Sequence, residues 1–329
     1  MRLGKSMRIT LTGMVLLLFA SISGAATGDR NLSRSVAGSD EPAMTVGQAM
    51  ILGLVEGLTE YLPVSSTGHL LLAERIMGIG DSPSASREER QRTRDAADAY
   101  IICIQAGAII AVLGLYFRRV KQMLRGLVGR DPDGSRLLAN VAAGFMPAAI
   151  IGLLFNRIIK AYLFGLWPVV AAWFVGGVAI LVVNRRKRDN CGPVHEGLSL
   201  EELTWRMALV VGFAQCIAMW PGVSRSLVTI VGGLIMGLSL SAAVEYSFLL
   251  GVVTLGAATA YDALKQGPMM MQTFEALPIA IGLLFAFISA VVSVKWMVAY
   301  LNRHGLAVFG YYRIAIALAT TAWIVTGTL

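Results

Sequence analysis

Six apolar stretches, each about twenty residues long, constrain the fold of this chain more than any other feature. A helix of that length crosses the ~30 Å hydrocarbon core of a bilayer. Composition agrees, because 56% of the residues are hydrophobic, 15% are charged and the mean hydropathy is +0.67. The sequence therefore predicts an all-α integral membrane protein with about six transmembrane helices. We expect the spans at residues 98–117, 137–156, 167–184, 240–261, 277–298 and 309–328.

The net charge of +8 comes from basic residues whose positions indicate membrane topology, and it does not indicate a nucleic-acid partner. No basic groove or nucleic-acid-binding motif accompanies the charge. Basic residues gather in short loops, which the positive-inside rule assigns to the cytoplasm. Lys295, Arg303 and Arg313 bracket the last connection. The three basic loops predicted on the cytoplasmic side are 118–130, 185–190 and 295–313, and the segments predicted outside are the N-terminus, 78–97, 262–275 and the C-terminus.

Residues 1–26 have the pattern of a secretory signal peptide. Basic residues precede an apolar run from Ile9 to Ile22, and small residues follow it. The alternative is an uncleaved first span, although the run is short for a bilayer. Residues 27–44, rich in Ser, Gly and Asp, are expected to form a flexible exported tail.

Two further apolar stretches are broken in the middle, so neither half of either stretch can span the bilayer. The first runs from Val46 to Met77 and is broken at Pro63, and the second runs from Trp205 to Leu238 and is broken at Pro221 and Gly222. We predict two re-entrant helix pairs. Leu62 precedes a proline and is pushed out of the helical region, which ends the first helix, and Ser65 or Ser66 can cap the second.

The two broken stretches align with each other without a gap when Gly53 is placed on Gly212. Glu56 then falls on Gln215, and Ser65 falls on Ser224. Each stretch is followed by three spans, and an odd number of spans reverses orientation. We therefore predict two inverted-topology repeats, at residues 45–184 and 185–329, with a site near the midplane where they meet. Irregular backbone at that depth must be buried in protein or line a wet cavity.

Glu56 and Glu60 are the first candidate functional residues, because carboxylates at bilayer depth are costly and their presence suggests function. They lie four positions apart, on one face of a helix, so both can reach one ligand. They can share a divalent cation, or one of them can pair with an arginine inside the bundle. His69 follows in the first turn of the next helix, where it is either a general acid, base or nucleophile or a structural histidine.

The second stretch contains Arg225 among three hydroxyls, Ser224, Ser226 and Thr229. A guanidinium, hydroxyls and backbone N–H groups at a helix N-terminus form an anion site that suits a phosphate. Arg225 paired with one of the glutamates is the alternative, and such a pair could open when an anion arrives.

At this point the chain resembles the bacterial undecaprenyl-diphosphatase family of the bacitracin-resistance type. The two signatures that carry the resemblance are EGLTEYLPVSSTGH and PGVSRSLVT. Supporting stretches such as IQAGAIIAVLGLYF, GFMPAAIIGLLF and EYSFLL extend the similarity over roughly residues 44–328. The N-terminal segment lies outside it.

The resemblance implies an enzyme that removes the terminal phosphate of undecaprenyl diphosphate. It thereby recycles the lipid carrier of peptidoglycan synthesis and confers bacitracin resistance. It implies a multi-pass protein of the bacterial inner membrane, with a site that opens to the periplasm, a polyprenyl diphosphate substrate and a divalent cation, Mg²⁺ or Ca²⁺. The resemblance leaves open whether the protein forms a homodimer. The site residues are Glu56, Glu60, Ser66, His69 and Arg225 as catalytic, Ser65, Ser224, Arg225, Ser226 and Thr229 for phosphate, and Glu56 and Glu60 for the metal.

Two departures and one alternative accompany this interpretation. Leu227 stands where the family has glycine, and we expect it to narrow the space beside the phosphate. The stretch GLSLSAAVEYSFLLGVV lacks an arginine and a proline that the family carries there. The alternative is a membrane carrier for polyprenyl phosphate or another anion, because secondary transporters also combine inverted repeats with intramembrane carboxylates.

Overall fold

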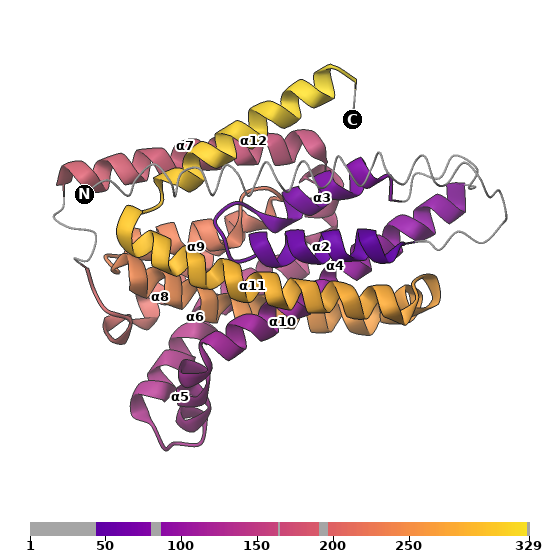
Figure 1. The fold of residues 1–329 in the computed structure, drawn as a ribbon. Coiled ribbons are helices and arrows are strands. Elements are labelled where there is room, and N and C mark those ends of the chain that lie inside the picture. Colours follow the sequence, from indigo (N-terminus) through magenta and orange to yellow (C-terminus); the bar gives the residue numbers. More distant parts are fainter. Residues whose placement is uncertain (1–43, 80–86, 164, 191–196, 328–329) are drawn as a thin grey trace.

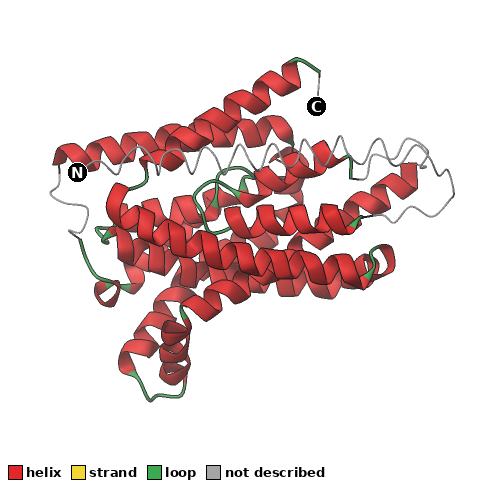
Figure 2. Cartoon of the chain, viewed as in Figure 1, coloured by secondary structure: helices red, strands yellow, loops and turns green. Residues whose placement is uncertain are grey.

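The computed structural model describes residues 44–79, 87–163, 165–190 and 197–327, and this part of the chain is built from helices (Figure 2). A single-residue β-bridge joins Leu198 to Leu238. The signal-peptide-like segment 1–26 and nearly all of the tail 27–44 lie outside the described residues, so the predictions made for them are untested.

Six helices are long and apolar enough to cross a membrane, which confirms the six predicted spans and makes this a multi-pass membrane protein. They pack roughly side by side along the long direction of the molecule (Figure 1). In chain order they are α4 (Arg87–Leu115), α6 (Pro132–Leu163), α7 (Leu166–Asn190), α10 (Leu240–Thr273), α11 (Ala276–His304) and α12 (Ala307–Val325).

Three segments predicted as loops are wholly or partly helical, and these predictions were wrong. Helix α4 begins inside the predicted loop 78–97, α10 runs through most of the predicted loop 262–275, and the basic loop 118–130 contains helix α5 (Phe117–Leu127). The physical reason is that a helix does not stop where its residues become polar. Polar side chains support helix outside the bilayer, as the hydrogen bond from Gln91 Nε2 to Asp95 one turn later shows (2.8 Å).

The two broken stretches form two helix pairs whose joining loops lie near the middle of the bundle (Figure 1). We call α2 and α3 with residues 60–65 the first helix pair, and α8, η3 and α9 with residues 220–224 the second helix pair. Their re-entry into the membrane stays a prediction. The bounds are α2 (Val46–Thr59), α3 (Ser66–Met77), η2 (Leu200–Glu202), α8 (Trp205–Cys216), η3 (Ile217–Met219) and α9 (Arg225–Ile235).

Each helix pair starts on a threonine cap, and the two threonines occupy aligned positions. Thr45 accepts a hydrogen bond from the Gln48 backbone N–H, and Thr204 accepts one from the Met207 N–H. A threonine at this position satisfies one of the otherwise unpaired N–H groups of the first turn. The same short-range signal therefore begins both pairs.

The aligned glycines Gly53 and Gly212 make equivalent close contacts. A Cβ atom on Gly53 would lie 2.3 Å from the carbonyl oxygen of Gly282 in α11, and one on Gly212 would lie 2.4 Å from the carbonyl oxygen of Gly144 in α6. Small residues let helix backbones approach closely, which is how helices associate inside a bilayer. These contacts support the repeat alignment, while the inverted orientation stays a prediction.

The main apolar core lies where the two helix pairs meet. Tyr61, Leu62 and Val64 of the first pair are in one buried cluster with Leu227 and Ile230 of the second, together with residues of α10 and α11. Polar groups that belong to the site are consequently enclosed by apolar side chains on several sides.

Candidate active site

Ser65 and Ser224 are the only described residues other than glycine with positive φ, at 73° and 78°, and they occupy aligned positions. Such backbone costs ~1–3 kcal/mol and persists where the surroundings enforce it, often at functional sites. Each serine immediately precedes a helix, α3 or α9. Both helix N-termini are thereby turned toward the loops in the middle of the molecule.

The caps of these two helices differ. Ser224 accepts a hydrogen bond from the Leu227 N–H (3.3 Å), whereas no side-chain hydrogen bond from Ser65 caps α3, so the prediction that a serine hydroxyl caps this helix is wrong for Ser65. Thr67 in the first turn of α3 is exposed among buried neighbours. The start of α3 therefore has no side-chain cap, and an uncapped helix N-terminus is a place where an anion binds readily.

One chain of hydrogen bonds joins the two helix pairs through Glu60. Ser66 Oγ donates to Glu60 Oε2 at 2.5 Å, and Arg225 Nη2 donates to Glu60 Oε1 at 3.1 Å. The Arg225 and Glu60 side chains are only 10% and 6% exposed, so their ion pair is shielded from water. A carboxylate, a hydroxyl and a guanidinium predicted from two distant motifs are thus in direct contact, and the pairing of Arg225 with a glutamate is confirmed.

Arg225 is held on its other sides by residues that the sequence did not single out. Its Nη1 donates to the Ser247 carbonyl of α10 at 3.1 Å, and its guanidinium lies 5.2 Å from the centre of the Tyr61 ring. Gly251 leaves room for it, because a Cβ atom there would lie 2.2 Å from Nη1. Tyr61 lies inside the first signature and Ser247 inside the stretch EYSFLL, but neither residue type by itself indicates a contact with an arginine.

Glu56 is 1% exposed, and neither of its carboxylate oxygens has a hydrogen-bond partner in the described part of the chain. It lies within electrostatic range of Glu60 and Arg225. A buried carboxylate without a partner is costly, so an orphaned one invites a proton or a cation. The residues therefore fit the predicted divalent cation, although the described residues hold no cluster of three or more His, Cys, Asp or Glu side chains.

The hydroxyls of the second helix pair are engaged by protein groups. Ser226 Oγ donates to the Leu62 carbonyl at 2.8 Å, with Ser224 Oγ 3.0 Å away from it. Thr229 Oγ1 donates to the Arg225 carbonyl at 2.8 Å and lies 2.7 Å from Ser247 Oγ. In this arrangement they fasten the second pair to the first and to α10, and their direct contact with phosphate stays a prediction.

His69 has hydrogen-bond partners other than Ser66 and Glu60. Its Nδ1 lies 2.6 Å from the Ser65 carbonyl, and its Nε2 lies 2.6 Å from the hydroxyl of Tyr312 in α12. Because a carbonyl only accepts, Nδ1 carries the hydrogen, and Nε2 is left to pair with the tyrosine. His69 thus anchors the strained Ser65 backbone, and the structure shows no contact through which it would relay the Ser66 proton.

Arg313 lies at the centre of the fold beside the site, and not at the edge of a loop as predicted. It was predicted to flank a cytoplasmic loop, but its side chain is fully buried and bonds to both helix pairs. Nη1 donates to the Pro63 carbonyl at 3.3 Å, and Nη2 donates to the Gly222 carbonyl at 2.8 Å. A lone arginine in an otherwise apolar span was the available signal. Because Arg313 lies close to the start of its span, the positive-inside rule counts it with the cytoplasmic loop before that span.

Leu227 points into the apolar core that the two pairs share and is only 4% exposed. Its backbone N–H is the group that Ser224 caps. The expectation that it narrows the space beside a phosphate stays a prediction.

The fold and the site together define a membrane-embedded protein in which a buried carboxylate at the end of α2 contacts a hydroxyl at the start of α3 and a guanidinium at the start of α9. The family model of the bacitracin resistance protein BacA matches residues 49–319, and the chain belongs to this family. It is 44% identical over 279 residues to an undecaprenyl-diphosphatase of Sorangium cellulosum, a match that covers 84% of this chain and 85% of the relative.

Two further relatives carry related names. The chain is 43% identical over 278 residues to undecaprenyl-diphosphatase 2 of Rhodospirillum rubrum, covering 84% of this chain and 94% of that protein. It is 41% identical over 269 residues to an undecaprenyl-diphosphatase of Rhodopseudomonas palustris, covering 82% and 93%.

Proposed function

We propose that this protein hydrolyses undecaprenyl diphosphate to undecaprenyl phosphate and inorganic phosphate. The observation that carries the proposal is the contact of Ser66 and Arg225 with the two oxygens of Glu60. It supplies a nucleophile, a base and a cation at one point, beside the uncapped N-terminus of α3. The names of the relatives supply the identity of the lipid.

The terminal phosphate binds at the start of α3 and draws Arg225 from Glu60, because a phosphate offers the guanidinium two acceptor oxygens. Glu60 then accepts the Ser66 proton as Oγ forms a bond to the terminal phosphorus. The bond from that phosphorus to the bridging oxygen breaks, and undecaprenyl phosphate leaves. Water attacks the phosphorus of the phosphoserine and breaks its bond to Ser66 Oγ. Glu60 returns the proton to Ser66 Oγ, and inorganic phosphate is released.

A water molecule that attacks the phosphorus directly would give the same products without a phosphoserine. Rapid quenching of the enzyme with labelled substrate distinguishes the two routes. Label retained on Ser66 supports the covalent route, and its absence in an active enzyme supports direct attack by water.

Glu56 and Glu60 are the residues that would hold a divalent cation, Mg²⁺ or Ca²⁺, together with oxygens of the substrate phosphates. Such a cation would neutralise charge on the diphosphate. Glu56 is otherwise a buried carboxylate without a hydrogen-bond partner in the described chain, which is the observation in favour of this assignment.

We place the protein in the bacterial inner membrane, with the site open to the periplasm. The distribution of basic residues supports this orientation, because the segments rich in Lys and Arg are then cytoplasmic. Bacitracin resistance and lipid-carrier recycling for the cell wall follow from the proposed reaction. A homodimer is compatible with the large exposed apolar surface of the spans, which a bilayer also covers.

The test is phosphate release from undecaprenyl diphosphate by the purified protein in detergent, with and without a chelator. We expect release that stops on chelation and that is lost in Arg225→Ala. Arg206→Ala is the matched control, since Arg206 is an exposed arginine over Trp205 in α8. Equal release by wild type and Arg225→Ala would remove Arg225 from the site. If a folded wild-type sample releases no phosphate, the proposed hydrolysis is overturned, and a membrane carrier for polyprenyl phosphate or another anion becomes the explanation.

A further inference from the structure

Helix α5 exposes two neighbouring stripes of different chemistry. Phe117 and Leu124 of α5, with Val128 directly after its last residue, are 59%, 58% and 64% exposed and recur at the spacing of one helix face. Arg118, Lys121 and Arg125 are exposed along the adjacent face. A helix with an apolar stripe beside a basic stripe is the pattern of a helix that lies in a lipid interface.

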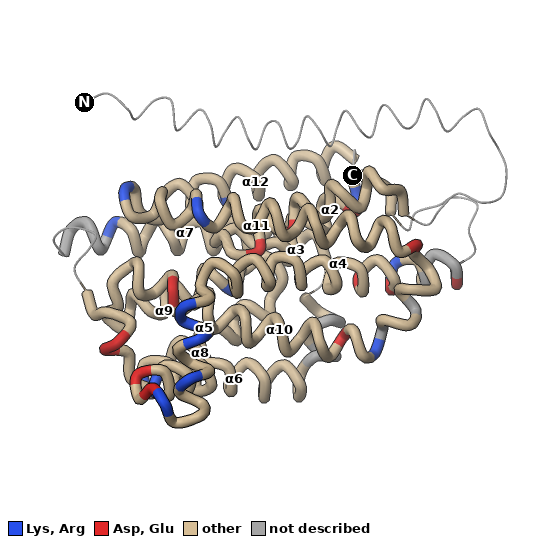
Figure 3. The backbone as a smooth tube through the Cα atoms, turned by 60° about the horizontal axis from the view of Figure 1, so that its bottom comes forward, with Lys and Arg blue, Asp and Glu red and all other residues tan. Residues whose placement is uncertain are grey.

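The position of α5 agrees with that pattern. The span in α4 ends at Leu115, the span in α6 begins at Pro132, and α5 lies between these two ends. It projects away from the bundle instead of continuing along it (Figure 1), and several positions of its backbone are coloured as Lys or Arg in Figure 3. A helix beside which two neighbouring spans end has the position expected of a helix at the bilayer surface.

Helix α5 is fixed in this position by tight packing on α6. A Cβ atom on Gly126 would lie 2.1 Å from the backbone nitrogen of Ser135, and Ser135 Oγ donates to the Gly126 carbonyl at 2.8 Å. The exposed stripes therefore belong to a helix whose rotation about its axis is set by the protein.

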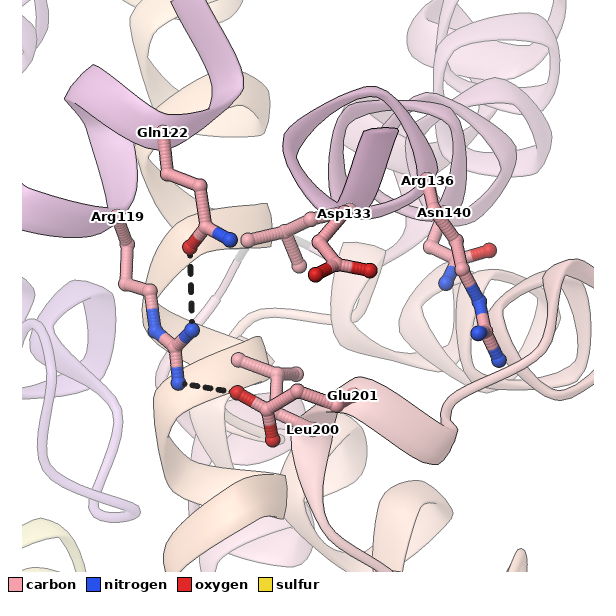
Figure 4. Close-up of a pocket in the computed structure, with 8 residues that line it drawn as sticks. Arg119, Gln122, Asp133, Arg136, Asn140, Leu200 and Glu201 are labelled. Atoms are coloured by element: carbon pink, nitrogen blue, oxygen red, sulfur yellow. Dashed lines mark hydrogen bonds and ion pairs between the residues drawn. The ribbon is translucent and has the colours of Figure 1, made fainter. Parts of the chain in front are cut away.

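Arg119 is turned inward and provides the second anchor. It donates to Glu245 of α10 at 2.9 Å and to Glu201 of η2 at 2.8 Å, and Figure 4 shows Arg119 bonded to both Gln122 and Glu201. The hydrogen bond to Glu245 raises the pKa of the Arg119 guanidinium, with burial partly opposing the shift. Arg119 is thus committed to protein partners, whereas the three basic residues of the outer stripe face away from the protein.

We propose that α5 is an interfacial helix that binds anionic phospholipid headgroups on the side of the membrane where the basic segments lie. The apolar stripe enters the acyl-chain boundary, and the basic stripe contacts the phosphates beside it. A protein partner would explain a covered apolar stripe but would not require basic residues along its whole edge. The proposal does not depend on the catalytic activity.

The first test measures lipid binding to the full-length protein in detergent by native mass spectrometry, with phosphatidylglycerol or phosphatidylcholine added. The variant Arg118→Gln/Lys121→Gln/Arg125→Gln should lose preferential phosphatidylglycerol binding, on the order of fivefold for each charge removed. The control is Lys295→Gln/Arg303→Gln, which removes two exposed basic residues of α11 outside α5, and losses are compared per charge removed. Equal loss in both variants, or loss in neither, overturns the proposal.

The second test identifies what covers the apolar stripe. Spin labels are placed with Phe117→Cys, Leu124→Cys or Arg125→Cys in a Cys103→Ser/Cys191→Ser/Cys216→Ser background, reconstituted in vesicles containing phosphatidylglycerol. Labels at 117 and 124 should be accessible to oxygen and shielded from a water-soluble nickel complex, and the label at 125 should show the reverse. Full access of the nickel complex to 117 and 124 overturns the proposal. Shielding from both reagents that depends on the protein-to-lipid ratio shows a second copy there and also overturns it.

Discussion

The two helix pairs share a backbone plan but divide the chemistry between them. Threonine caps, close-packed glycines and a strained serine recur at aligned positions. The side chains at the tips differ, since Glu60 of the first pair aligns with Met219 of the second and Ser66 aligns with Arg225. The carboxylate and the hydroxyl that bonds to it thus come from one pair, and the guanidinium comes from the other.

Because of this difference, neither helix pair alone holds the carboxylate, the hydroxyl and the guanidinium of the candidate site. Glu60 finds its cation only across the interface, and Arg313 of α12 binds a carbonyl of each pair. The repeated backbone provides two helix N-termini that each follow a strained serine, and the substitutions between the copies decide which side chains lie there. The following predictions test that division of roles.

The largest effect is expected at Glu60. Glu60→Gln removes the base beside Ser66 and the counterion of Arg225, and turnover should fall by about 10³-fold. Phosphate release by the purified variant measures this. Met219→Ala, the aligned change in the second pair, is the control and should retain most of the activity. Similar losses in both variants would contradict the division of chemistry.

The next effect concerns the residue that fastens the pairs together. Arg313→Met leaves the Pro63, Ala172 and Gly222 carbonyls without their donors and should lower the free energy of unfolding by about 3 kcal/mol. Arg313→Lys keeps a charged donor and should lose less. Thermal unfolding in detergent compares the two, and wild-type stability in Arg313→Met would show that the pairs are held by other contacts.

A smaller effect tests whether the two copies pack alike. Gly53→Ala and Gly212→Ala should each destabilise by about 1–3 kcal/mol, because the added methyl group would collide with a backbone carbonyl. Gly256→Ala in α10 is the matched control. Nothing lies within 4 Å of its Cβ position, and it should stabilise by roughly 0.5–1 kcal/mol. Unequal responses of the first two variants in denaturation would weaken the alignment of the copies.

The smallest effect separates the two strained serines. Ser65→Gly relieves an unfavourable backbone conformation without losing a cap and should stabilise by about 1 kcal/mol. Ser224→Gly gains the same relief but loses the bond to the Leu227 N–H and the contacts of Ser224 Oγ with the Leu62 carbonyl and Ser226 Oγ, so its net gain should be smaller. Equal gains in unfolding temperature would show that the Ser224 cap contributes nothing.

The membrane class, the six spans and the two broken stretches could be predicted because they rest on local properties of the chain. Span length follows from bilayer thickness, and the breaks follow from Pro63 and from Pro221 with Gly222. Segment ends were predicted less well. Residues after Arg87 and after Asp262 stay helical outside the spans, where hydropathy no longer indicates helix.

By itself, the sequence determined which residue types sit at membrane depth and that Glu56, Glu60, Ser66 and Arg225 belong to motifs of one family. Only the tertiary structure decided their partners: Glu60 bonds to Ser66 and Arg225, whereas His69 turns to Tyr312. It also moved Arg313 from a predicted loop edge to the centre of the fold. The reason is that hydropathy and helix caps depend on a few neighbouring residues. A buried polar group must find a hydrogen-bond partner, and for Glu60 and His69 that partner includes a residue more than a hundred positions away in the sequence.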